Sequence, residues 1–230
     1  MDNSVLKTIW DGLDWSVLTD GLFNIIPAVI CVTFHEFCHG LAAYAMGDDT
    51  AKKAGRLTLN PLRSLDMSGL VMMAAFHIGW AKPVPVNMHK FKNPKRGMAL
   101  TALAGPCSNL LLTVFALLLY GLLFIPLSGR QAGELILETL VRTAILSTSL
   151  GVFNLLPVPP LDGSKVVFSL MNNRAYETLM RYERYGFLAL IALSVTGVIT
   201  DPLSRMTEAV FSRCFAVAEW SYELAKEFLK

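Results

Sequence analysis

Long apolar stretches alternate along this chain with short loops that carry most of the charge. Three stretches approach or exceed the roughly 20 residues that a helix needs to cross a bilayer, namely 22–47, 97–126 and, with its flanks, 185–200. A fourth, 137–156, carries Glu138 and Arg142 near its start, and this spacing lets the two charges pair on one helix face. The pattern predicts an all-α polytopic membrane protein with about four transmembrane helices.

One further apolar segment, 67–79, is too short to cross a bilayer, and Pro83 and Pro85 follow it closely. We expect a re-entrant or β-like membrane segment here (within 67–80), because non-helical backbone is tolerated at membrane depth where protein satisfies its polar groups. The flanks, 58–65 and 82–91, are predicted to be extended loops or short strands.

The last 26 residues, 205–230, place Val210, Cys214, Val217, Leu224 and Phe228 at helical spacing with charged residues between them. This pattern is too charged to span a bilayer and predicts an amphipathic, interfacial C-terminal helix. The chain therefore divides into an N-terminal interfacial segment (1–21), a membrane core (22–204) and this helix.

The composition supports a membrane protein and argues against several other classes. Of 230 residues, 53% are hydrophobic and 17% are charged, whereas soluble domains have about 25% charged residues. A net charge of +2 gives no indication of nucleic-acid binding. The four cysteines show no C-x-x-C spacing, so neither a cysteine zinc site nor a disulfide framework is expected. No cleaved signal peptide is expected, because the N-terminus lacks an apolar core followed by small residues.

Lysine and arginine gather in three loops, 48–66, 82–96 and 163–184, while the opposite side carries only Lys7 and Arg130. If the four spans alternate, all three basic loops fall on one side, and the positive-inside rule places that side in the cytoplasm. We therefore expect a multi-pass protein of the plasma membrane with its N-terminus outside.

The first span contains the motif His35-Glu36-Phe37-Cys38-His39. On a helix, H-E-x-x-H aims two imidazoles at one metal ion, and the glutamate beside them can act as a general base. An unpaired charge at membrane depth costs at least ~2–3 kcal/mol, which disfavours a chance match. The motif lies about 12 Å from the cytoplasmic end of its helix. Cys38 points about 100° away from His39 and is expected to be a packed thiol.

A catalytic zinc site usually has three protein ligands, so a third must come from elsewhere. His77 and His89 are candidates, but Asp162 is the better one. The prolines within 157–160 cannot continue a helix, and unwound backbone at this depth is tolerated beside protein or a water-filled cavity. The alternative role for Asp162 is the N-cap of the helix that follows.

The H-E-x-x-H motif together with N-x-x-P-x-P-x-L-D-G at 154–163 resembles the site-2 protease family, peptidase family M50, of intramembrane zinc metalloproteases. The stretches GRLTLNPLRSLD (55–66), GWAKPVPVN (79–87) and NPKRGMALTALAGPCSN (93–109) are similar to its compact bacterial members. The resemblance covers 23–200. No inserted PDZ-like domain and no nucleotide-sensing domain are expected.

The resemblance implies a role for each matching residue. His35, His39 and Asp162 would bind one Zn2+, Glu36 would be the catalytic glutamate, and Asn154 would help to hold the substrate peptide. Asn109, in the Gly105-Pro106-Cys107-Ser108-Asn109 interruption of the second span, would support the site; a packing notch for close helix approach is the alternative interpretation of this stretch.

We therefore expect a zinc-dependent intramembrane endopeptidase that acts on transmembrane protein substrates within a lipid bilayer. One alternative is a membrane-bound zinc protease for non-transmembrane chains, which would take a downstream glutamate as its third ligand; Glu138 is the only other carboxylate in a later span. A second alternative is a non-catalytic scaffold that binds membrane helices, although such a protein has no need of Glu36.

Overall fold

The computed structural model describes residues 15–64, 66, 82–172 and 174–228, the last range with gaps at 177, 179–180, 182–184, 187–189, 191 and 195. Within these residues every regular element is a helix. In chain order they are α2 (Trp15–Ala45), α3 (Thr50–Lys53), α4 (Pro61–Ser64), η1 (Met88–Lys90), α6 (Pro94–Leu127), α7 (Gln131–Asn154), α8 (Asp162–Ser169) and α10 (Thr200–Phe228).

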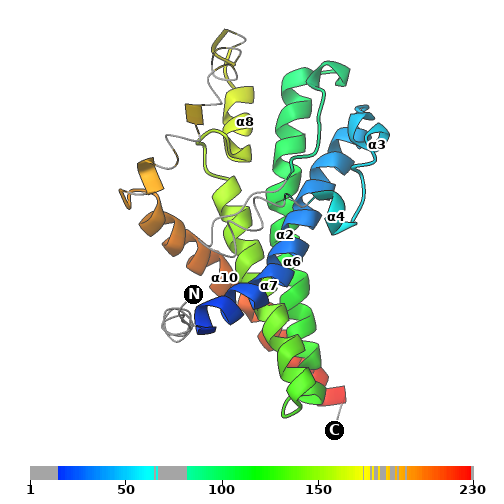
Figure 1. Cartoon of the computed structure of the whole chain (residues 1–230), viewed down its shortest axis with the longest axis vertical. Helices are drawn as coiled ribbons and strands as arrows, with labels where there is room; N and C mark the ends of the chain where they lie inside the picture. Colours follow the sequence, from blue (N-terminus) through cyan, green and yellow to red (C-terminus); the bar gives the residue numbers. More distant parts are fainter. Residues whose placement is uncertain are drawn as a thin grey trace, which may run out of the picture.

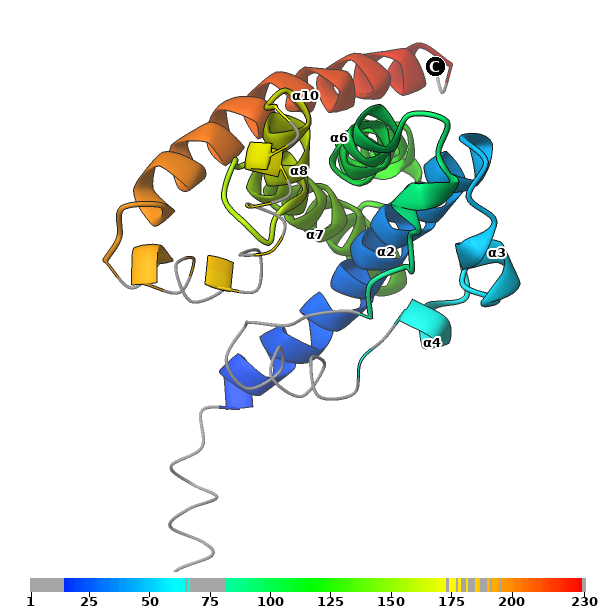
Figure 2. The same ribbon diagram turned by 90° about the horizontal axis from the view of Figure 1, so that it is seen from above.

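The centre of the molecule is a hairpin of the two long helices α6 and α7, with α2 on one side and α10 on the other (Figure 2). Short polar side chains join the two helices of the hairpin. The Thr113 and Thr148 hydroxyls lie 3.0 Å apart, and the Ser147 hydroxyl donates to the Asn109 carbonyl at 2.8 Å. Small polar residues of this kind let apolar helices approach closely, and their hydroxyl groups form hydrogen bonds with each other or with main-chain carbonyls within a membrane.

Three helices are long and apolar enough to cross a membrane: Phe23–Ala45 within α2, the whole of α6 and the whole of α7. They confirm three of the predicted spans, and the Glu138–Arg142 pair is also present, with Arg142 Nε 2.9 Å from Glu138 Oε1. The remaining predicted span, 185–200, is interrupted by positions outside the described residues and stays a prediction. The short apolar segment 67–79 lies outside the described residues altogether.

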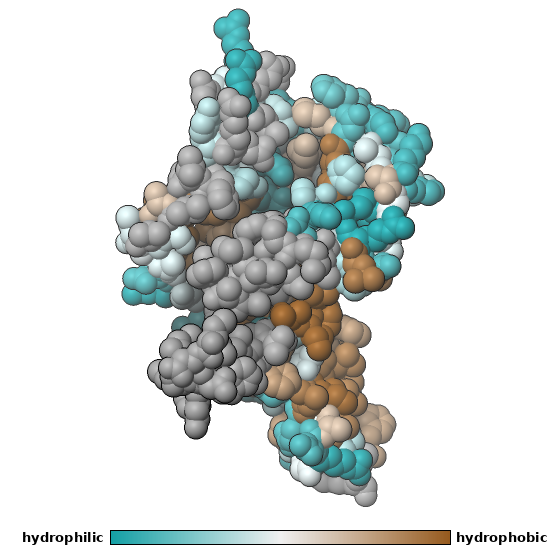
Figure 3. Space-filling model, viewed as in Figure 1, coloured by the Kyte–Doolittle hydropathy of each residue, from teal (hydrophilic) through white to brown (hydrophobic). Residues whose placement is uncertain are grey.

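Large apolar side chains are exposed along the spanning helices, among them Ile26, Ile30, Leu111 and Phe115. Figure 3 shows apolar surface between two more polar ends. In Figure 1, α3, the start of α6 and the end of α8 lie together at the upper end, and the α6–α7 turn lies at the lower end. The regions that carry the basic loops therefore share one end of the molecule, as the alternation of spans predicted.

The expectation for 58–65 is wrong in part, because Pro61–Ser64 forms the short helix α4 instead of extended chain. The Asn60 side chain accepts a hydrogen bond from the Leu62 amide at 3.1 Å, and Pro61 supplies a backbone angle suited to a first helical position. Residues 82–87 have no regular structure and lead into η1, which the Asn87 side chain caps by accepting from the His89 amide at 3.1 Å. No strand is present in the described part of the chain.

The predicted C-terminal helix exists and begins at Thr200. Its apolar face packs on protein: Cys214, Phe215 and Ala218 join Leu117 and Ala144 in a buried cluster with the hairpin. Gly121 of α6 is what permits this contact, because a Cβ at this position would collide with the Ser221 hydroxyl and the Ala218 carbonyl. The helix is thus anchored to α6 and α7, while its interfacial placement stays a prediction.

Candidate metal centre

Three side chains of the type that binds metals converge where the first residue of α8 faces α2 beside α6. His35 Nε2 lies 2.9 Å from His39 Nε2 and 3.2 Å from Asp162 Oδ2, and His39 Nε2 lies 3.0 Å from the same oxygen. The three side chains are only 7–12% exposed. The structure therefore brings together, across 127 residues of sequence, the three side chains that the motifs singled out as ligands.

Local structure explains how Asp162 reaches the histidines. Helix α7 ends at Asn154, the proline-rich residues 155–161 are not helical, and α8 begins at Asp162. The N-cap of α8 is Leu161, and no side chain caps this helix end. The alternative role of Asp162 as an N-cap is therefore not what the structure shows, and its carboxylate is turned toward the imidazoles.

The second nitrogen of each imidazole faces a carbonyl oxygen on α6. His35 Nδ1 lies 3.3 Å from Asn109 Oδ1, and His39 Nδ1 lies 2.7 Å from the Thr101 main-chain oxygen. Because a carbonyl accepts, these partners favour the proton on Nδ1 and leave a lone pair on each Nε2. Asn109, expected as a supporting residue, thus contacts His35 on the side of the ring away from His39 and Asp162.

Gly105 makes room for both imidazoles. A Cβ at this position would lie 2.5 Å from His39 Cε1 and 2.6 Å from His35 Cε1, far inside contact distance. The glycine that the sequence indicated as a point of close approach therefore packs against the histidine side chains themselves. This contact lets α6 bring the Thr101 and Asn109 carbonyls up to the rings.

The triad opens into a cavity of about 360 Å³ that is lined also by Glu36, Val84, Val86, Asn154 and Lys165. Glu36 Oε2 accepts a hydrogen bond from the Val84 main-chain amide at 2.8 Å. Asn154 lies on the cavity wall and donates to the Leu150 carbonyl at 3.0 Å. Lys165 Nζ lies 3.8 Å from Asp162 Oδ1, the carboxylate oxygen that faces away from the imidazoles.

The other candidate ligands are not part of this cluster. His89 is exposed in η1, and Glu138 is occupied by Arg142 on α7. His77 lies outside the described residues. Cys38 is likewise no member of the group, as its direction on the helix predicted. Sequence reasoning did not find the Thr101 carbonyl or the Val84 amide, because main-chain groups leave no signature in residue types.

The donor set fits zinc. Two imidazole nitrogens and one carboxylate oxygen are typical zinc ligands, and bonds of about 2.0–2.1 Å in a tetrahedron separate such ligands by roughly 3.3 Å. The observed separations of 2.9–3.2 Å are close to this value. With neutral imidazoles all three facing atoms are acceptors, an arrangement that a bound cation stabilises.

Comparison with known proteins agrees with this geometry. The profile of peptidase family M50 matches residues 119–196. The chain is 38% identical over 194 residues to the "Putative zinc metalloprotease YwhC" of Bacillus subtilis, and the alignment covers 81% of this chain and 86% of that protein. It is 30% identical over 188 residues to the "Putative zinc metalloprotease Rip2" of Mycolicibacterium smegmatis, covering 78% and 70% of the two chains.

The "Putative zinc metalloprotease Rip2" of Mycobacterium tuberculosis strain H37Rv is 30% identical over 212 residues, and the alignment covers 89% of this chain and 75% of that protein. No solved structure matches this chain. The chain belongs to peptidase family M50, the family of zinc metalloproteases that its motifs resemble.

Proposed function

We propose that this protein is a zinc-dependent intramembrane endopeptidase that hydrolyses peptide bonds in or near the transmembrane segments of other membrane proteins. His35, His39 and Asp162 would hold one Zn2+. The observation that carries the proposal is the triangle of three acceptor atoms facing a cavity that Glu36 also lines. The helix that supplies both histidines is apolar and long enough to span a membrane, which supports hydrolysis within the bilayer.

The chemistry follows from the groups around the cavity. Zinc, when bound, supplies an activated water and polarises the scissile carbonyl. Glu36 takes the proton of the attacking water and passes it to the leaving amide nitrogen. The Val84 amide holds the Glu36 carboxylate in place through its 2.8 Å hydrogen bond. Asn154 lines the same cavity, and we assign it the role of holding the substrate peptide.

A transmembrane substrate must first unwind, because the amides of a helix are hydrogen-bonded to one another. Val84 and Val86 belong to a segment without helical structure that lines the cavity. Such a segment offers main-chain groups to an unwound substrate strand, in the manner of β-augmentation. Residues 82–87 are therefore the proposed docking edge for the substrate.

We also propose that the active site faces the cytoplasmic half of the plasma membrane. The start of α6, α3 and the end of α8 lie at one end of the molecule, and the loops beside them carry most of the basic residues (Figure 1). The positive-inside rule assigns that end to the cytoplasm. His39 lies six residues before the end of α2 at that side.

The test is a Glu36→Gln variant of the purified full-length protein in nanodiscs, assayed on a panel of single-span membrane proteins. Cleavage should fall by about 10²–10⁴-fold, the usual contribution of a general base, with zinc content unchanged. His89→Gln, which changes an exposed histidine outside the cluster, is the matched control and should cleave normally. The inactive variant should also trap bound single-span proteins in native membranes for identification by mass spectrometry.

Cleavage by Glu36→Gln at the wild-type rate would contradict the general-base assignment. A wild-type protein with stoichiometric zinc that cleaves no single-span substrate would contradict intramembrane proteolysis. Cleavage of soluble chains alone would indicate the alternative function, a membrane-bound zinc protease that acts on non-transmembrane chains.

A further inference from the structure

Asp48 is a fully buried carboxylate that the metal site does not use. It lies three residues beyond the end of α2, and its side chain is 0% exposed. Burying a carboxylate is costly unless hydrogen bonds and an opposite charge compensate. The Thr50 amide and hydroxyl donate to Oδ1, the amide at 3.0 Å, the Asn87 amide donates to Oδ2 at 2.6 Å, and Lys90 Nζ lies 3.5 Å from Oδ1.

The hydrogen bond to Asn87 joins two parts of the chain that are 39 residues apart. Three residues before Asn87, the Val84 amide donates to Glu36 on the same helix that leads to Asp48. Segment 84–87 is therefore attached at two points, to Glu36 on α2 at one end and to Asp48, just beyond the end of α2, at the other. Val84 also packs closely against Gly40, which lies between these two points on the helix.

The attached segment forms a wall of the proposed active site, because Val84 and Val86 line its cavity. If the attachment at Asn87 is lost, the Val84–Glu36 hydrogen bond is the one hydrogen bond among the described residues that still joins the segment to α2, beside the packing of Val84 on Gly40. A wall that moves by about 1 Å can lower catalytic efficiency by up to 10²-fold, because the reacting groups are no longer aligned.

We propose that Asp48 is a positioning residue for proteolysis: by accepting the Asn87 amide it holds segment 84–87 against α2, which keeps the Val84 amide on Glu36 and the substrate-docking wall in register. This inference rests on the proposed function, in which Glu36 is the base and residues 82–87 receive the substrate.

The neighbouring Asp49 provides a matched control. It has the same charge and contacts the same lysine, with Oδ1 2.6 Å from Lys90 Nζ and Oδ2 2.5 Å from Lys53 Nζ. In contrast to Asp48, it makes no hydrogen bond to the main chain of 82–87 among the described residues. Asp49→Asn therefore removes one negative charge from the same place and leaves the attachment intact.

The decisive variant is Asp48→Asn. Its side chain offers one carbonyl oxygen and one NH₂ group, so that either the Thr50 amide or the Asn87 amide faces a donor. We would measure three properties of the purified full-length protein in nanodiscs: bound zinc, KM and kcat on a single-span substrate, and hydrogen–deuterium exchange of peptides covering 82–91.

We expect Asp48→Asn to keep its zinc, to exchange about tenfold faster over 82–91 than the wild type, and to lose about 10–100-fold in kcat/KM. KM should rise, because the docking wall is displaced. A purely structural role would lower kcat through a smaller folded fraction and leave KM unchanged. Asp49→Asn should match the wild type within about twofold in all three measurements.

Unchanged exchange over 82–91 would overturn the proposal, and so would faster exchange with KM and kcat/KM equal to those of Asp49→Asn. If Asp48→Asn fails to fold or loses zinc, the test becomes a comparison of Asn87→Pro with Asn87→Ala. Both lack the side-chain cap of η1, but only proline lacks the amide donor, so equal exchange and equal kinetics in this pair would refute the attachment. Should the wild type cleave no single-span substrate, the proposed function fails, while the exchange data still decide whether Asp48 holds the segment.

Discussion

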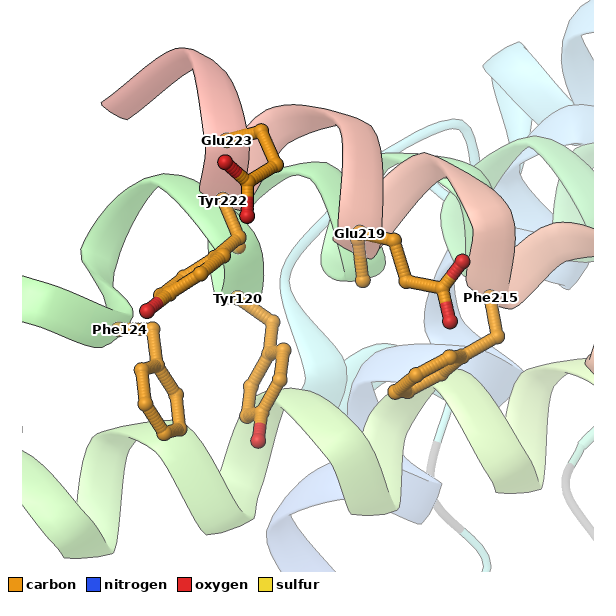
Figure 4. A pocket seen from close by; sticks show the side chains of 8 residues that line it. Tyr120, Phe124, Phe215, Glu219, Tyr222 and Glu223 are labelled. Atoms are coloured by element: carbon orange, nitrogen blue, oxygen red, sulfur yellow. The ribbon is translucent and has the colours of Figure 1, made fainter. Parts of the chain in front are cut away.

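Two cavities lie against α6, one near its start and one near its end, and they are similar in size but differ in the side chains that line them. The first, about 360 Å³, contains the histidine–aspartate triad and Glu36. The second, about 450 Å³, lies between α6 and α10 and is lined by Tyr120, Phe124, Phe215 and Tyr222, with Glu219 and Glu223 at its edge (Figure 4). The larger cavity is the less promising site, because a functional pocket needs convergent polar groups as well as volume.

The contents of the second cavity explain its different character. The Phe124 ring packs edge-on against Tyr120 and Tyr222, with ring centroids 5.6 and 5.7 Å apart, as aromatic side chains do in ordinary helix packing. Glu223 is paired with Lys226 at 3.2 Å on the exposed face of α10. The side chains of this cavity are mostly aromatic, whereas three polar atoms of the triad face one another.

Both cavities depend on a glycine of α6, and this makes the comparison testable. At Gly105 the space of the missing side chain is taken by two imidazoles, and at Gly121 it is taken by Ser221 and Ala218 of α10. A methyl group should therefore damage chemistry at one position and helix packing at the other.

The largest effect is expected for Asp162→Ala. This change removes one of the three acceptor atoms and leaves two histidines, so that zinc should be lost and proteolysis should fall below detection. Metal analysis of the purified protein and a cleavage assay measure both. Glu138→Gln, the control on α7, should keep its zinc. Zinc retained by Asp162→Ala would show that another side chain completes the site.

Gly105→Ala should come next. The added methyl group displaces both imidazoles from the Thr101 and Asn109 carbonyls that orient them, and loss of such supporting contacts costs about 10–100-fold in metal affinity. Chelator competition measures zinc affinity, and thermal unfolding of the zinc-free protein should change little. Unaltered zinc affinity would mean that α6 shifts to accommodate the methyl group and the imidazole rings keep their positions.

Gly121→Ala should give the converse result. The methyl group collides with main-chain and side-chain atoms of α10, and overpacking of this kind costs about 1–3 kcal/mol of stability. Denaturation in detergent should show the loss, with zinc affinity as in the wild type. If Gly121→Ala weakened zinc binding and Gly105→Ala did not, the contrast between the two ends of α6 would be wrong.

Removing the positive charge beside Asp162 should have a smaller effect. Lys165→Met removes the cation 3.8 Å from Asp162 Oδ1 and keeps most of the side-chain volume. Because this lysine supports a ligand oxygen only at long range, zinc affinity should fall by less than about tenfold, at the low end for groups behind a metal ligand. Chelator competition against the wild type measures the difference, and a loss as large as that of Gly105→Ala would assign Lys165 a larger part.

The smallest effect is expected on acidification, when Asp48, which lies outside the spanning helices, becomes protonated. Burial alone would raise the pKa of Asp48, but hydrogen bonds from Thr50 and Asn87 and the charge of Lys90 outweigh it and lower the pKa below 3.8. A carboxyl whose pKa is lower in the folded state contributes stability above its ordinary pKa, and the contribution is lost as pH falls through the folded value. Protection of 82–91, corrected for intrinsic exchange, should persist at pH 5–7 and fall below about pH 4. Asp48→Asn should lack this step.

Local pattern predicted much of the site. Helical periodicity alone places His35 and His39 one turn apart, and the proline run 157–160 predicts that the helix must end before Asp162. The three apolar spans also follow from length and hydropathy. These features depend on neighbours in sequence, which is why residue types reveal them.

Other predictions depended on contacts that sequence spacing does not encode. The proline run favoured Asp162 over His77 and His89 as the third ligand, but its contact with the histidines depends on packing between residues 127 positions apart. The extended expectation for 58–65 failed at Pro61–Ser64, where an asparagine side chain and a proline start a helical turn. The partner of the C-terminal amphipathic face also followed only from the fold, since an apolar stripe packs equally well on lipid or on protein.

The motif H-E-x-x-H, its apolar surroundings and the L-D-G segment are properties of the chain itself, and they suffice to indicate a metal-dependent peptidase of the membrane. The tertiary structure supplied the groups that orient and surround the site. The Thr101 carbonyl and the Val84 amide are main-chain atoms common to every sequence, and the Asp48–Asn87 hydrogen bond spans 39 residues. Such groups acquire a function only from where the packing of α2 against α6 and against residues 84–87 places them, because their chemistry is the same at every other position in the chain.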